Sequence, residues 1–128
     1  MTTIAAPAWF RAALDALCAG DIAAFVAMYD DHAVHEFPFA PEGRPSRLDG
    51  KPAIAAYMQG LAAIRFEAFE DVRVREAGDE LIVEANGRGT RLATDTPFFH
   101  QYVWFITHVD GRVSHFRDYM NPLRMRPG

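Results

Sequence analysis

One carboxylate near the end of the chain stands where it could handle a proton. Asp118 lies between an Asp-Gly turn and Pro122, in a run that alternates between apolar and polar residues. Asp-Gly pairs begin hairpins and proline ends strands, so the run is predicted to be a strand. Alternation then places Asp118 on one face with Phe116 and Met120. Because apolar surroundings raise a carboxyl pKa, Asp118 could act as an acid or base near neutral pH.

A second carboxylate, Glu36, lies in an extended segment over residues 32–39, among apolar neighbours on its own face. Two carboxylates that meet in an apolar cavity push their pKa values apart, so that one serves as acid and the other as base. The sequence therefore predicts Asp118 and Glu36 as catalytic residues. The alternative for Asp118 is an ion pair with Arg117 or Arg88 on the surface or in a dimer interface, and for Glu36 an exposed strand position.

Aromatic and histidine side chains are candidates for the wall of such a cavity. Each has an ordinary alternative, because large aromatic residues also pack in cores and interfaces. The predicted substrate-binding residues are Trp9, His35, Tyr57, His100, Tyr102, Phe116 and Met120. The five histidines lack metal-ligand spacing, so no metal is predicted. The chain has no phosphate-binding glycine loop and no Cys-x-x-Cys pair, so no cofactor is predicted either.

Composition narrows the class of protein. The 128 residues suit one domain, 1–128, and half of them are hydrophobic, as in globular proteins. A formal net charge of −4 argues against a nucleic-acid partner. No apolar run approaches the roughly 20 residues that cross a bilayer, so we expect no membrane partner. No signal peptide is recognisable, and the single cysteine, Cys18, cannot form an internal disulfide, which predicts a cytoplasmic protein.

Hydrophobic spacing predicts helices first and strands afterwards. The period is close to 3.6 in the first half of the chain and close to 2 in the second. The expected helices span residues 7–18, 22–30 and 50–61. The expected strands span 64–77, 98–109 and 112–121, and a return strand after the first of them carries Leu81, Val83 and Ala85. A loop over 41–49, rich in proline, glycine and arginine, could close over a site. This order predicts an α+β fold.

Five phrases of the chain resemble one family. They are Ala19-Gly20-Asp21, the run from Tyr29 to Val34, the run from Leu48 to Ile54, Asp110-Gly111-Arg112-Val113, and the run from Arg117 to Pro122. Together they resemble the nuclear-transport-factor-2-like, or SnoaL-like, family, and the last resembles the phenazine-biosynthesis A/B proteins. The resemblance covers almost the whole chain. It implies a cone fold, with three N-terminal helices on a strongly curved antiparallel sheet.

The resemblance also bears on the candidate residues. Asp118 falls at the acid/base position of the phenazine A/B proteins and at a catalytic aspartate of limonene-epoxide hydrolase. The hydrolase's Arg-x-Asp pair has no counterpart in residues 85–89. Glu36 falls at the general-base position of ketosteroid isomerase, whereas Ala13 and Val103 replace or adjoin its two oxyanion-binding residues. Neither a complete hydrolase nor a complete steroid isomerase site is implied.

Two functions remain open on the sequence. The first is a cofactor-independent enzyme that uses acid/base chemistry for isomerisation, dehydration, cyclisation or condensation of a small hydrophobic molecule. The second is a non-catalytic module that binds a small molecule or assembles as a dimer. Aromatic residues on both faces of the 98–109 strand predict a homodimer through the sheet face opposite the cavity.

Overall fold

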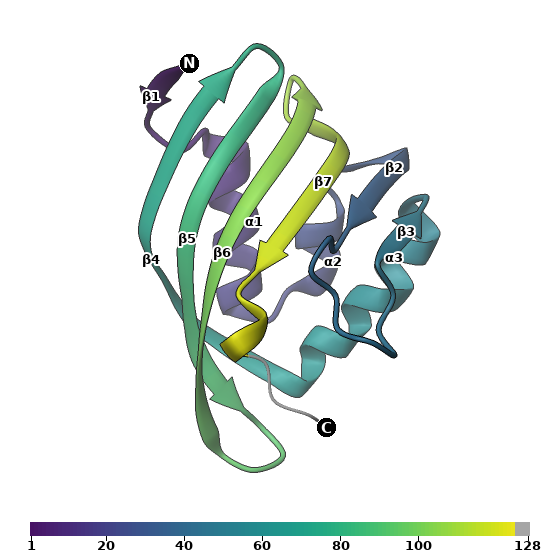
Figure 1. The fold of residues 1–128 in the computed structure, drawn as a ribbon, viewed down its shortest axis with the longest axis vertical. Coiled ribbons are helices and arrows are strands. Elements are labelled where there is room, and N and C mark those ends of the chain that lie inside the picture. Colours follow the sequence, from purple (N-terminus) through teal and green to yellow (C-terminus); the bar gives the residue numbers. More distant parts are fainter. Residues whose placement is uncertain (125–128) are drawn as a thin grey trace.

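A long curved sheet wraps around a layer of helices (Figure 1). The computed structural model describes residues 1–124. Its strands are β1 (Thr2–Ile4), β2 (Tyr29–Glu36), β3 (Arg47–Asp49), β4 (Ile64–Ala77), β5 (Glu80–Arg91), β6 (Thr96–Val109) and β7 (Arg112–Met120). Its helices are α1 (Ala8–Ala19), α2 (Ile22–Val26) and α3 (Lys51–Met58), with short 3₁₀ turns η1 (Gln59–Ala63) and η2 (Pro122–Arg124). None of these helices is long and apolar enough to cross a membrane.

The first two helices form where the sequence predicts them. Phe10, Ala13 and Leu14 form the buried stripe of α1 at helical spacing. Gly20 ends α1 in the left-handed conformation, at φ 76°, which costs glycine little. Asp21 then caps α2, because its carboxylate accepts a hydrogen bond of 3.0 Å from the Ala24 amide.

The second helix is shorter than the sequence predicts. The expected helix over 22–30 ends at Val26, and Tyr29 already begins β2 with no exposed surface. The Val113 amide donates a 2.8 Å hydrogen bond to the Met28 carbonyl, so β7 offers this segment a strand partner. Pairing with a distant strand therefore outweighs the local helical pattern. The predicted loop over 41–49 likewise contains β3, which pairs with β2.

The sheet has the order β1-β4-β5-β6-β7-β2-β3. Its neighbouring strands are antiparallel, as predicted, except for β2 and β7, which run parallel with Glu36 beside Arg117. Strands β4 to β7 follow one another in the sheet as a meander. The last of them, β7, lies next to β2, which comes much earlier in the chain. That pairing continues the sheet beyond β7 to β2 and β3 and makes the sheet mixed (Figure 1).

Alternation along the central strands separates two faces. On β5, Leu81, Val83 and Ala85 point into the core, opposite Ile106, Trp104 and Tyr102 of β6. Two irregularities in the register of β4 with β5, between Phe66 and Ala68 and between Glu70 and Arg73, accompany the bend of the sheet. The concave face therefore carries apolar and aromatic side chains that face the core.

Candidate functional site

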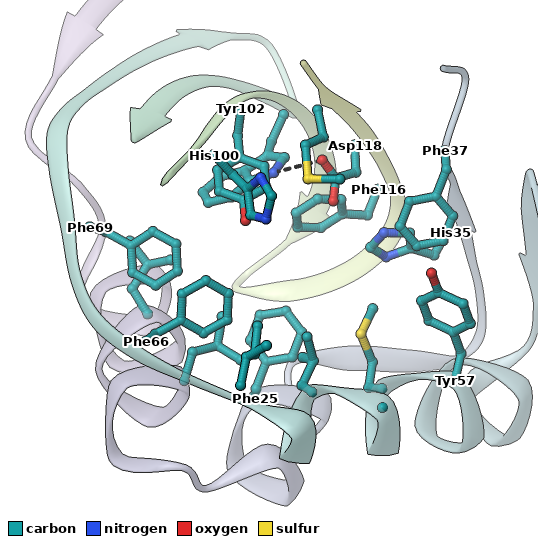
Figure 2. A pocket seen from close by; sticks show the side chains of 18 of the residues that line it. Phe25, His35, Phe37, Tyr57, Phe66, Phe69, His100, Tyr102, Phe116 and Asp118 are labelled. Carbon is teal, nitrogen blue, oxygen red and sulfur yellow. Dashed lines mark hydrogen bonds between the residues drawn. The ribbon is translucent and has the colours of Figure 1, made fainter. Parts of the chain in front are cut away.

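The concave face of the sheet and the helices enclose a cavity of about 440 Å³ (Figure 2). Most of its wall is apolar. The lining side chains with polar or charged groups are Arg44, Tyr57, Arg91, Tyr102, Trp104, Asp118 and the two histidines His35 and His100. A smaller recess of about 60 Å³ adjoins it below the loop after β2 and shares Tyr57, Asp118 and Met120 with it. A cavity of this size suits a small molecule.

Asp118 is the only carboxylate among the described residues that line the cavity. It projects from β7 beside Trp104, whose indole Nε1 donates a 3.1 Å hydrogen bond to Asp118 Oδ1. Burial raises the pKa of Asp118 from 3.8 to about 7, and the Trp104 hydrogen bond opposes that rise. The residue keeps some accessible area and lines the cavity. It can therefore exchange protons with the cavity near neutral pH.

His35 is a neutral, oriented side chain of the same wall. Its ring stacks on Phe116, with centroids 4.6 Å apart and an angle of 8°. Burial, helped by His115, lowers the pKa of His35 to about 3. The buried Tyr29 hydroxyl lies 2.7 Å from His35 Nδ1. We assign the shared proton to the Tyr29 hydroxyl, because that hydroxyl has no other recorded acceptor; the hydrogen of the neutral ring is then on Nε2.

Two buried side-chain nitrogens in the described part of the chain lack a hydrogen-bond partner, His35 Nε2 and His100 Nδ1. Both histidines line the cavity. Burial, assisted by the charge of Arg91, lowers the pKa of His100 to about 4, so this ring is neutral at physiological pH as well. An unpaired buried polar atom costs about 1–3 kcal/mol, and a bound molecule would recover that free energy if the ring turned this nitrogen into the cavity.

Six of the seven predicted substrate-binding residues line the cavity: His35, Tyr57, His100, Tyr102, Phe116 and Met120. Trp9 does not. Phe10 faces the cavity, and the next residue around a helix is turned by about 100°, so Trp9 points elsewhere. Its ring packs on Gly111, and its centroid lies 4.8 Å from that of His108. The prediction that Trp9 lines the cavity was wrong.

Glu36 also lies outside the cavity. Its Oε1 is 2.5 Å from Nε2 of His115, on the convex face of the sheet. His35 points inward from β2, and adjacent strand residues point to opposite faces, so Glu36 has to point outward. The expected meeting of Asp118 and Glu36 in one cavity does not occur. The cavity therefore offers one carboxyl group and two neutral histidines rather than two carboxylates.

Several lining residues were not predicted. Phe66 and Phe69 enter from β4, and Arg44 comes from the loop after β2. Arg91 is at the end of β5, and strand alternation from Leu81 would have placed it on the inner face. As for metals, the described residues contain no group of three or more histidine, cysteine or acidic side chains that could hold an ion.

Comparison with known families agrees with this architecture. Residues 10–116 match the model of the SnoaL-like domain. The chain belongs to the SnoaL-like family. Its relatives include the uncharacterized protein YesE of Bacillus subtilis, 36% identical over 80% of this chain and 72% of the relative. A PhzA/B-like protein of Pseudomonas aeruginosa is 30% identical over 82% of this chain and 76% of the relative.

Solved structures share the fold of this SnoaL-like chain. A candidate isomerase from Bacillus subtilis superimposes with a TM-score of 0.84 at 33% identity, covering 90% of this chain and 85% of that one. An epoxide hydrolase of M. tuberculosis, described as LEH-like, gives 0.69 at 20% identity, covering 91% and 83%. The second likeness concerns the fold alone. The predicted nuclear-transport-factor-2-like fold and SnoaL-like family are both confirmed.

Proposed function

We propose that this SnoaL-like protein is a cofactor-independent enzyme that transfers protons on a small hydrophobic carbonyl compound. The observation that carries the proposal is Asp118, a carboxyl group with a pKa of about 7 in a largely apolar cavity. A group whose pKa is near the working pH is both a usable base and a usable acid. The epoxide hydrolase and the candidate isomerase among the structural relatives make catalysis on this fold chemically reasonable.

The proposed chemistry begins at a carbon next to a carbonyl group. The Asp118 carboxylate removes a proton from that carbon, and the electron pair moves to the carbonyl oxygen to give an enolate. When the ring of His35 turns its buried Nε2–H toward the cavity, that group donates a hydrogen bond to the oxygen, and the neutral ring replaces the oxyanion-binding residues that this chain lacks. Protonated Asp118 then returns the proton to a different carbon, or to a leaving oxygen. Isomerisation, dehydration and condensation all begin with this enolate.

A binding module without turnover is the second candidate. It is favoured by the single carboxyl group of the cavity, since Glu36 contacts His115 on the other face of the sheet. In that case Asp118 and the two histidines only hold polar groups of a ligand. The two candidates differ in proton exchange, which an enzyme of this kind catalyses and a binding module does not.

Deuterium exchange tests the proposal without knowledge of the natural substrate. The protein is incubated in D₂O with small cyclic ketones, beginning with cyclohex-3-enone, and deuterium on the carbon next to the carbonyl is followed by NMR. We expect exchange above the buffer background and its loss by about 10²–10⁴-fold in Asp118→Asn, because proton transfer by a placed side chain is worth that much.

Glu36→Gln is the matched control, because it removes a carboxylate from the convex face and leaves the cavity unchanged. We expect this variant to exchange at the wild-type rate. Full activity in Asp118→Asn would contradict the proposed role of Asp118. Binding of the ketones without any exchange would favour the binding module.

A further inference from the structure

Two arginine side chains line the cavity without an acidic partner. Arg44 and Arg91 take part in none of the ion pairs recorded for the described residues, whereas Arg88, three residues before Arg91, pairs with Glu70 at 3.0 Å. The chain does not lack acidic residues that could pair with them, because it has 17 acidic residues and 13 basic ones. A guanidinium group is always charged, so the cavity wall carries two uncompensated positive charges.

The carboxyl group of Asp118 does not balance these two positive charges. Asp118 is the one carboxyl group of the described lining, and its pKa of about 7 leaves it only partly ionised at neutral pH. The cavity is therefore positive on average, although the chain as a whole is negative. A ligand that fits this cavity gains from carrying a negative charge as well as an apolar body.

Arg91 lies on the same face of the sheet as His100, which has a buried nitrogen without a hydrogen-bond partner. His100 pairs with Gly87 across β5 and β6, and Arg91 follows Gly87 by four residues on the same face. The charge of Arg91 influences the His100 ring, whose buried Nδ1 has no hydrogen-bond partner. Both side chains line the cavity, so an oxyanion bound there can meet the guanidinium group of Arg91 and the ring of His100. Asn121, which follows β7, already has a partner, because its Nδ2 donates a hydrogen bond of 2.9 Å to Gln101 Oε1.

We propose that Arg91 and His100 form a subsite for the carboxylate of an otherwise apolar ligand, and that Arg44 adds positive charge to the same cavity. This inference rests on the proposed function and names its substrate class as an apolar oxo-acid rather than a neutral ketone. A planar carboxylate matches the two-pronged geometry of a guanidinium group. A monoanion suits the site better than a phosphate dianion, because Asp118 adds negative charge to the same cavity when it ionises.

Calorimetric titration with matched aromatic ligands tests the subsite at about pH 8. The ligands are 2-naphthoate, the neutral 2-naphthamide and 2-naphthyl phosphate, which share one apolar body. We expect the wild-type protein to bind 2-naphthoate about tenfold more tightly than the amide, with the phosphate weaker than the carboxylate. Arg91→Gln should reduce the preference for carboxylate over amide to about one, and Arg44→Gln should reduce it less, because Arg44 is exposed.

Arg88→Gln is the control, since Arg88 lies on the same strand but pairs with Glu70 outside the cavity. It should keep the full preference. Equal binding of acid and amide by the wild type, an unchanged preference in Arg91→Gln, or no binding of any of the three ligands at millimolar concentration would overturn the subsite. The preference should survive in Asp118→Asn. A kept preference without catalysis would therefore reject the proposed reaction and leave the subsite standing.

Discussion

Asp118 illustrates how far single residues could be predicted from the sequence. Its neighbours Phe116 and Met120 and the stop at Pro122 were enough to place it on an inward face, and it lines the cavity. The assignment of Glu36 failed for a reason already visible in the sequence. His35 and Glu36 are adjacent in a strand, so they cannot both face one cavity. The sequence could not say which of them does, because that depends on pairing with β7.

The unusual pKa of Asp118 has a consequence for stability. In the unfolded chain the carboxyl group ionises near 3.8, whereas in the folded protein it keeps its proton up to about pH 7. Between these values the folded state binds more protons, so stability falls as pH rises. Below about pH 4 both states are protonated and the contribution is fully present. Above about pH 7 it is lost.

Asp118→Asn removes this titration while keeping an oxygen that can accept from Trp104. We expect the variant to gain stability relative to the wild type as pH rises from about 4 to 8. The gain should reach roughly 2–4 kcal/mol, because one pKa unit corresponds to about 1.4 kcal/mol. Urea unfolding of both proteins across this pH range measures the difference. A variant that is less stable at every pH would make Asp118 a structural residue.

At the level of elements, the sequence predicted the long periodic segments well and the short ones poorly. The strands β4 and β6 and the helix α1 have strong periods and clear turns, and they lie where expected. The predicted second helix is four residues longer than α2, and the residues of β3 were predicted to lie in a loop. In both places the backbone is held by hydrogen bonds to another strand, to β7 for Met28 and to β2 for β3, and local spacing does not contain such pairing.

The contact of β4 with β5 depends on a residue without a side chain. A Cβ atom at Gly89 would overlap the carbonyl oxygen of Arg65 and lie 2.7 Å from the ring of Phe98. Because backbone cannot yield as a side chain can, we expect Gly89→Ala to destabilise the protein by about 3 kcal/mol. Gly60→Ala is the control, since nothing lies within 4 Å of a Cβ there. Equal stability of both variants by chemical denaturation would contradict this account of the sheet.

On the scale of the whole molecule, the convex face of the sheet is the surface that we propose joins two copies. Val103 is 36% exposed on β6 beside Tyr119 of β7, and the Tyr119 ring lies 5.1 Å from that of Phe39, which is 57% exposed. The sequence indicated this face through the aromatic residues of β6. It could not indicate the parallel pairing of β2 with β7, since the two strands are more than 70 residues apart.

Light scattering tests the proposed dimer. The wild-type protein should have twice the 14.3 kDa mass of the chain at micromolar concentration. Val103→Asp should shift it toward the monomer, because a charge would be buried without a partner. Leu92→Asp, an exposed apolar position at the far end of β5, should leave the mass unchanged. A wild-type mass equal to that of one chain would contradict the proposed dimer.

The account as a whole rests on a carboxyl group that keeps its proton in an apolar cavity. Carbon-13 NMR follows the side-chain carboxyl carbon of Asp118 directly during a pH titration, with the Asp118→Asn spectrum assigning the signal. We expect a titration midpoint of about 7, because burial disfavours the ionised form. A midpoint near the ordinary aspartate value of 3.8 would mean that the cavity does not tune this residue, and the proposed acid/base chemistry would lose its basis.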